Sequence, residues 1–122
     1  MNQESRIQQS LMQWAAYASG SNPELGLLYS IPNGANTTIQ NRKRLVCEGL
    51  KAGMPDLCLP VQRGDFSALY IELKTPKGRL SKVQEERIES LQTYGNMVVV
   101  CRGLEETIES INKYLSIKQV RG

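Results

Sequence analysis

An acidic and a basic side chain interrupt an otherwise apolar run at residues 69–74, which reads LYIELK. Side chains at alternate positions of a β-strand point to the same face, so an extended run would place Glu72 beside Lys74. Charged groups are rarely kept inside a sheet without a partner or a metal ion. The run therefore indicates either a charged site or a strand end in solvent, where Lys74 reaches water and pairs with Glu72.

A second carboxylate is expected to face Glu72 across a β-hairpin. The runs DLCLPV and FSALYIELK read as strands joined by the turn QRGD, and a hairpin centred on Gly64 sets Asp56 opposite Glu72. Pro60 predicts an edge strand or a bulge, and a one-residue slip would turn Asp56 to the other face. The alternative for Asp56 is a turn or cap residue after Pro55.

Two carboxylates held this close repel each other unless a proton or a cation lies between them. The chain has no histidine, which excludes a Ser-His-Asp triad and histidine-ligated zinc or iron. Oxygen ligands from Asp56, Glu72 and the main-chain carbonyl of Leu73 favour a hard cation, Mg²⁺ or Mn²⁺. With the ammonium of Lys74 beside it, such an ion predicts hydrolysis of phosphodiester bonds, because both stabilise charge on phosphate oxygens.

The elements that must position these groups follow the order helix, strand, helix, strand, strand, helix, strand, helix. This order predicts an α/β fold with a mixed sheet flanked by helices. The run MVVVC at residues 97–101 predicts a central strand buried on both faces. The expected helices span residues 4–19, Asn36 or Thr37 up to the segment GLKAGMP, residues 81–94 and residues 105–117. Their expected core positions are Ile7, Leu11, Trp14, Ala15 and Ala18, then Ile39, Leu45 and Val46, then Val83, Ile88 and Leu91, and finally Ile108, Ile111 and Leu115.

Composition limits the class of protein. A chain of 122 residues, 40% of them hydrophobic, is expected to form one domain over residues 1–122, and no apolar run is long enough to span a bilayer. The polar amino terminus lacks the layout of a signal peptide, so we expect a cytoplasmic protein without a membrane partner. Cys47, Cys58 and Cys101 are odd in number and widely spaced, which predicts buried apolar positions.

Basic residues form two groups, one on each side of the proposed metal site in the sequence. The formal net charge of +3 is compatible with a polyanionic partner. Lysine and arginine near a metal centre would hold phosphates without reading base sequence, and the alternative for each group is an ordinary solvated face. Their position around the carboxylates favours DNA. The first group is Arg42, Lys43, Arg44 and Lys51, and the second is Lys77, Arg79 and Lys82.

These motifs together resemble a known nuclease family. GMPD at residues 53–56, IELK at residues 71–74 and a following helix with Gln84 resemble the PD-(D/E)xK nuclease superfamily, and within it the VRR-Nuc family of virus-type replication-repair nucleases. An opening helix with Glu4, the PNG loop at residues 32–34 and the run MVVVCR extend the resemblance over nearly the whole chain. The resemblance implies a restriction-endonuclease-like core. It also implies that Asp56 and Glu72 bind the metal, that Lys74 acts in catalysis, and that Glu4 and Gln84 support the site.

Three of the implied roles have local alternatives. Glu4 is also a carboxylate favoured in the first turn of a helix. Gln84 is also the expected capping-box partner of Ser81. Asn33, in the PNG loop, is expected to contact DNA, or else serves only its turn.

Stand-alone domains of this size resemble phage and bacterial members that act as homodimers on Holliday junctions or related branched DNA. The resemblance therefore implies a Mg²⁺-dependent, structure-selective DNA endonuclease of a bacterial or phage-infected cell, in which a two-fold dimer makes two symmetric cuts. Trp14, Tyr17 and Tyr114 are interface candidates if they are exposed. The alternatives are a restriction-type endonuclease on linear duplex DNA and a DNA-binding or assembly module with an inactive site.

Overall fold

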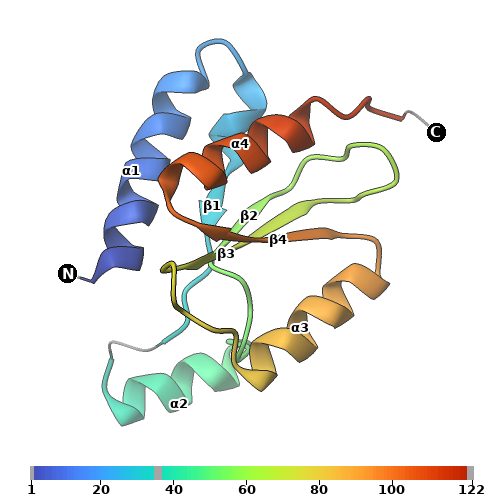
Figure 1. Ribbon diagram of the computed structural model, residues 1–122. Helices are drawn as coiled ribbons and strands as arrows, with labels where there is room; N and C mark the ends of the chain where they lie inside the picture. Colours follow the sequence, from blue (N-terminus) through green and yellow to red (C-terminus); the bar gives the residue numbers. More distant parts are fainter. Residues whose placement is uncertain (1, 35–36, 121–122) are drawn as a thin grey trace.

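The computed structural model of the chain describes residues 2–34 and 37–120. Its sheet has the strand order β1-β2-β3-β4, in which β3 pairs antiparallel with β2 and parallel with β4, so the predicted mixed α/β fold is confirmed. Helices α1 and α4 cover one face, α3 lies under the other, and α2 projects away from the sheet on the side of α3 (Figure 1). The elements are α1 (Gln3–Ala18), the 3₁₀-helix η1 (Pro23–Leu27), β1 (Tyr29–Ser30), α2 (Ile39–Cys47), β2 (Leu57–Leu59), β3 (Leu69–Lys74), α3 (Lys82–Thr93), β4 (Met97–Arg102) and α4 (Leu104–Leu115).

Alternate residues of β3 enter two different environments. Its odd-numbered side chains, Leu69, Ile71 and Leu73, belong to the hydrophobic core, which also contains buried residues of α1 and α4. Its even-numbered side chains therefore point to the opposite face of the sheet. Burial of the odd-numbered side chains therefore fixes the face of the sheet to which Glu72 and Lys74 point.

The hairpin of β2 and β3 has the predicted register. Every pair in this ladder is equally distant from Gly64. Nearer the turn the next bridge joins Arg63 to Phe66, so that residues 60–62 face only residues 67–68. Of the two alternatives for Pro60, the structure therefore has a bulge, which lies between the ladder and the turn. The end of the hairpin that carries Asp56 and Glu72 keeps the predicted register.

Strand β4 lies at the edge of the sheet, so the prediction of a central strand was wrong. Its residues 97–100 are only partly buried, although α3 and α4 both pack against it. A continuous apolar run indicates that both faces of a strand are covered, and it does not fix the strand's lateral position in the sheet.

Helix α2 differs most from prediction, because two of its three expected core residues are exposed. Ile39 is 76% exposed and Val46 is 55% exposed, although both were expected in the core. The helix begins at Ile39, where the hydroxyl of Thr38 accepts a hydrogen bond from the N–H of Asn41. The other expected start, Asn36, lies outside the described residues.

Further corrections concern single side chains. Val83 in α3 is exposed rather than buried, and so is Cys47, whereas the other two cysteines are buried as predicted. Tyr114 is excluded as an interface residue, because it is 1% exposed and its hydroxyl donates a hydrogen bond to the carbonyl of Val61. Tyr17 is 88% exposed and stays a candidate.

No helix within residues 2–34 or 37–120 combines the length and the apolar character needed to cross a membrane.

Candidate functional site

Asp56 is held from two sides at the start of β2. Its main-chain carbonyl accepts a hydrogen bond from the N–H of Ile31 at 2.8 Å, next to β1. Its side-chain Oδ2 accepts a hydrogen bond from the N–H of Leu73 at 2.7 Å, in β3. The carboxylate therefore lies against β3 beside Glu72, as the register of the hairpin predicted.

The loop before Asp56 passes so close to α3 that a glycine is required. Gly53 has a φ of 77°, and a Cβ at this position would lie 2.6 Å from the main-chain oxygen of Val83. This close approach brings the start of β2 next to the first turn of α3. Gln84, which lies in that turn, is thereby placed near the carboxylates.

Glu72 is a buried carboxyl group with an incomplete set of partners. It is 2% exposed, and its Oε1 has no hydrogen-bond partner in the part of the chain that the structure describes. Burial, followed by the negative charge of Asp56, raises the pKa of Glu72 to about 8, and the charge of Lys74 opposes this rise. A buried carboxyl group in such surroundings needs a proton or a cation.

Lys74 and Gln84 both approach the other oxygen of Glu72. The Nζ of Lys74 lies 3.8 Å from Oε2, and Nε2 of Gln84 donates a long hydrogen bond of 3.5 Å to the same atom. Gln84 also completes the capping box of α3, because its Oε1 accepts a hydrogen bond from the N–H of Ser81. The two sets of contacts that the sequence left as alternatives for Gln84 therefore occur together.

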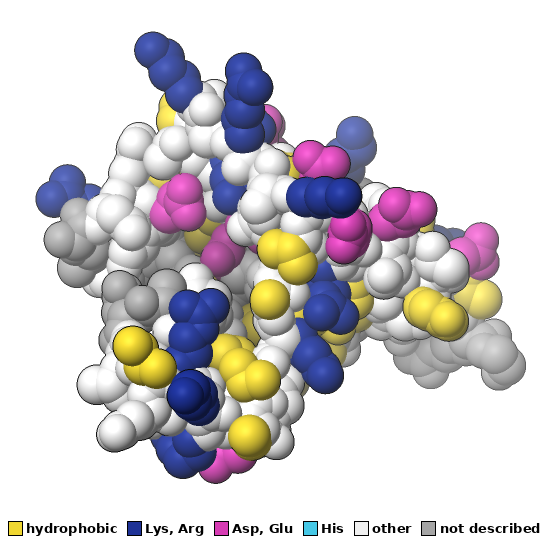
Figure 2. Space-filling view, turned by 90° about the horizontal axis from the view of Figure 1, so that it is seen from below, with side chains coloured by type: hydrophobic (Ala, Val, Ile, Leu, Met, Phe, Trp, Pro, Cys, Tyr) yellow, Lys and Arg dark blue, Asp and Glu magenta, His cyan; other side chains and the backbone are white. Residues whose placement is uncertain are grey.

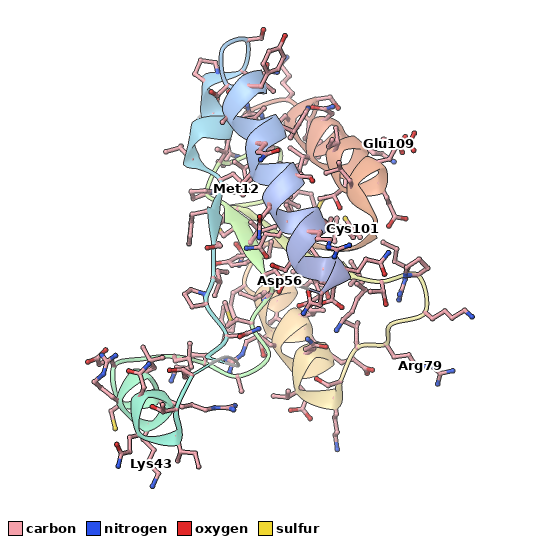
Figure 3. The ribbon with its side chains drawn as sticks, turned by 90° about the vertical axis from the view of Figure 1, so that its left-hand side faces the viewer. Met12, Lys43, Asp56, Arg79, Cys101 and Glu109 are labelled. Atoms are coloured by element: carbon pink, nitrogen blue, oxygen red, sulfur yellow. The ribbon has the colours of Figure 1, made fainter. Side chains whose placement is uncertain are left out.

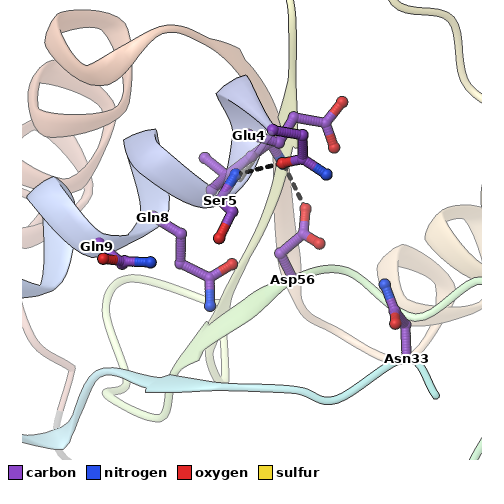
Figure 4. Close-up of a pocket in the computed structure, with 8 residues that line it drawn as sticks. Glu4, Ser5, Gln8, Gln9, Asn33 and Asp56 are labelled. Atoms are coloured by element: carbon purple, nitrogen blue, oxygen red, sulfur yellow. Dashed lines mark hydrogen bonds between the residues drawn. The ribbon is translucent and has the colours of Figure 1, made fainter. Parts of the chain in front are cut away.

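A pocket of about 310 Å³ opens between the first turns of α1 and the ends of β2 and β3 (Figure 4). Glu4 and Asp56 both line it, and the charge of Glu4 contributes to the raised pKa of Glu72. Glu4 also occupies the first turn of α1, so its two readings are compatible. Asn33 lines the same pocket from the loop after β1.

The donor atoms at this site fit a hard cation that has few protein ligands. Within the described residues, no group of three or more His, Cys, Asp or Glu side chains is placed to hold an ion. The candidate ligands are therefore the carboxylates of Asp56 and Glu72 and the main-chain carbonyl of Leu73. Mg²⁺ is commonly held by one or two carboxylates and keeps several water ligands. The unpartnered Oε1 of Glu72 is an atom that such an ion would satisfy.

The two basic groups lie on different sides of the site. In Figure 3, Lys43 on α2 lies at the lower left and Arg79 in the loop after β3 lies at the right, and Asp56 lies above both. Arg44 forms an ion pair of 2.8 Å with Glu48, which partly neutralises its charge. Lysine and arginine side chains are spread over the face seen from below, where hydrophobic side chains lie among them (Figure 2). Among the predicted site residues, the structure therefore brings the carboxylates, Lys74, Gln84 and Asn33 together, and it leaves the basic groups farther out.

Arg102 is a positioning residue that the sequence reading missed. It is the register partner of Lys74 at the end of β4. Its guanidinium group donates hydrogen bonds to the carbonyls of Thr75 at 2.8 Å and Gly78 at 2.6 Å. These bonds hold the loop that carries the second basic group. The run MVVVCR shows a basic residue at a strand end, but the partners of that residue depend on tertiary structure.

The pocket also contains side chains that the sequence reading did not select. Ser5 and Gln8 line it together with Glu4. The helical spacing could have identified Gln8, because residues four apart on a helix share a face and Gln8 follows Glu4 by four residues.

Comparisons with known proteins concern the family and the fold of the chain. The family model described as the VRR-NUC domain matches residues 2–105. A solved structure described as a "VRR_NUC domain protein" is similar to the chain with a TM-score of 0.82 and 26% sequence identity, over 100% of this chain and 95% of the other. No curated protein matches the chain.

Proposed function

Because the chain belongs to the VRR-NUC domain family, we propose that it is a Mg²⁺-dependent endonuclease that hydrolyses phosphodiester bonds in branched DNA. Membership of this family means a nuclease-type fold, with DNA as the expected class of substrate. The finer proposal is that the chain cuts four-way junctions as a homodimer, and that Mn²⁺ can replace Mg²⁺.

One observation carries the proposal. Two carboxylates from neighbouring strands, Asp56 and Glu72, lie side by side, and one oxygen of the buried carboxyl group has no partner among the described residues. A purely structural site of this kind would be costly, because the carboxylates of Asp56 and Glu72 repel each other and Glu72 must take up a proton or a cation. A cation between the two groups removes that cost.

The side chains of the site divide the work of hydrolysis. Asp56, Glu72 and the carbonyl of Leu73 would hold the ion, which supplies positive charge that stabilises the phosphate oxygens and acidifies water. The ammonium of Lys74, whose side chain is 11% exposed, would donate a hydrogen bond to the attacking water or to a phosphate oxygen. Gln84 orients Glu72 through its long hydrogen bond. Glu4 and Asn33 line the pocket beside Asp56, next to the expected place of the scissile phosphate.

The basic groups would hold the rest of the DNA. The first consists of Arg42, Lys43, Arg44 and Lys51, and the second of Lys77, Arg79 and Lys82. Both lie around the carboxylates rather than among them, which suits contacts to phosphates away from the cut. Arg102 supports the second group by holding its loop.

A homodimer would meet the need for two cuts in a four-way junction. One site cuts one strand, and a two-fold axis relates two sites and two strands. Tyr17 in α1 is 88% exposed, and a large exposed aromatic side chain is typical of an interface.

The test is a cleavage assay with the purified protein on four-way-junction, flap and linear duplex DNA, in Mg²⁺ or in EDTA. We expect cleavage of the branched substrates in Mg²⁺ and none in EDTA. Sequence-dependent cleavage of linear duplex would instead indicate a restriction-type enzyme. Binding of DNA without cleavage of any substrate would indicate a DNA-binding module and would contradict the proposal.

A further inference from the structure

The pocket beside the carboxylates extends farther than the metal chemistry requires. Glu4, Asp56 and Leu73 lie at its metal end, and Ser5 and Gln8 continue its wall along α1 (Figure 4). Its described lining contains no lysine or arginine and consists mainly of hydroxyl, amide and carboxylate groups. This part of the pocket can therefore hold a part of the substrate other than the scissile phosphate.

Gln8 is the side chain best placed to contact such a group. It follows Glu4 by four residues, so both side chains lie on the same face of α1. Gln8 is half-buried, and in Figure 4 its amide extends from the helix on the side of the pocket. Within residues 2–34 and 37–120 its side chain has no hydrogen-bond partner. A half-buried amide in this state has a donor and an acceptor available to a ligand.

The chemistry of the lining favours a nucleobase over a phosphate. A phosphate in this part of the pocket would stand close to Glu4 and Asp56 without a cationic side chain from the lining. An amide donates and accepts hydrogen bonds together, and base edges present the same mixture of groups. Enzymes that receive a displaced base read its edge through such bonds. Displacing a base costs least where it is mismatched, damaged or already single-stranded, and flaps and opened junctions present single-stranded bases.

We infer that Gln8 hydrogen-bonds to the edge of an unpaired base next to the scissile phosphate. This inference rests on the proposed function, since it needs a strand that passes the carboxylates. It adds a base-contacting subsite to the metal site and gives a physical reason for a preference for branched DNA.

The experiment combines a change in the protein with a change in the DNA. The cut made by the wild-type protein in a four-way junction is mapped first, and an abasic nucleotide is then placed on each side of it. We expect that Gln8→Ala and the abasic nucleotide on one side each lower kcat/KM about tenfold, the effect of one lost hydrogen bond. Together they should lower it no further than either does alone.

Two variants serve as controls. Gln8→Met keeps the length of the side chain and its packing but has no amide, so it should behave like Gln8→Ala. Gln13→Ala removes an exposed glutamine from the same helix, away from the pocket, and should match the wild-type protein on both substrates.

Three results would overturn the inference. The first is a loss of kcat/KM of about a hundredfold when Gln8→Ala and the abasic nucleotide are combined. The two losses would then multiply, which would mean that Gln8 and the base act independently. The second is wild-type activity of both Gln8 variants. The third is loss of the Gln8 effect when a neutral methylphosphonate replaces the neighbouring phosphate, which would assign the subsite to the DNA backbone. If the wild-type protein cuts no DNA, the proposed function itself fails, and this result is distinct from the other three.

Discussion

The end of the β2–β3 hairpin and helix α2 both carry charged side chains, but the protein holds them in opposite ways. At the hairpin, Asp56 is fixed by hydrogen bonds to two neighbouring segments and Glu72 is 2% exposed. Helix α2 has no buried residue, and its Lys43 extends into solvent. The hairpin charges therefore meet a low-dielectric environment, and the charges of α2 meet water.

This difference assigns different kinds of work to the two regions. Buried, fixed charges act on each other and on reacting atoms strongly and over short distances. Exposed charges on a projecting helix attract a polyanion over longer distances and are screened by salt. Changes at the hairpin should therefore alter chemistry and metal binding, and changes on α2 should alter only the affinity for DNA.

Removal of the ammonium at the hairpin should have the largest effect. Lys74→Ala is expected to lower kcat for junction cleavage by about a hundredfold or more, because a group that stabilises the transition state is lost. Junction binding should change little. Gel-shift and single-turnover cleavage assays measure the two quantities, with Lys113→Ala, an exposed lysine of α4, as the control. Full activity of Lys74→Ala would remove this residue from the mechanism.

A change of ligand charge should have the next largest effect. Asp56→Asn keeps the shape of the side chain and an oxygen that can accept the hydrogen bond from Leu73, so the fold should persist. The affinity for Mn²⁺, measured by calorimetry, is expected to fall about tenfold or more. The matched control is Asp65→Asn, which changes the only other aspartate of the chain, in the hairpin turn. Equal Mn²⁺ affinity of wild type and Asp56→Asn would show that Asp56 is not a ligand.

The raised pKa of Glu72 predicts a pH-dependent stability of the metal-free protein. Because burial and Asp56 raise this pKa from 4.5 to about 8, the folded state keeps a proton that the unfolded chain releases above about pH 4.5. The contribution of Glu72 to the free energy of unfolding should therefore be complete below pH 4.5 and decline toward pH 8. Thermal melts in EDTA should show Tm falling over this range more steeply for wild type than for Glu72→Gln. Parallel pH profiles of the two proteins would contradict the assignment.

The smallest effect is expected on α2. Lys43→Ala should weaken DNA binding a few-fold and reduce the slope of log affinity against log salt by about one, the value for one phosphate contact. The value of kcat at saturating DNA should stay at the wild-type level. A loss of kcat would place α2 in the chemistry and would remove the distinction between the two regions.

The sequence was sufficient to predict the arrangement of the hairpin site. Its register follows from a short turn and from the period-two pattern of the strands, which are local properties. For Pro60 the sequence left an edge strand or a bulge as alternatives, and the structure has the bulge, on the turn side. The register therefore placed Asp56, Glu72 and Lys74 correctly relative to one another, whereas the position of Gln84 came from the family resemblance.

The positions of whole elements could not be predicted in the same way. Strand β4 is as apolar as a central strand because helices pack against both of its faces. Its residues do not indicate that one of its edges lacks a neighbouring strand. Ile39 and Val46 lie on one side of α2, but the sequence does not show whether another element covers that side. Arg102 was missed because its two acceptors are main-chain carbonyls, whose positions depend on the folded loop.

The most direct test of the account is a crystal structure of the protein soaked in Mn²⁺, with the ion located by its anomalous scattering. We predict a peak within bonding distance, about 2.2 Å, of carboxylate oxygens of both Asp56 and Glu72, with the carbonyl of Leu73 as a third ligand. No peak at this site, or a peak only at other acidic side chains such as those of α4, would contradict the account.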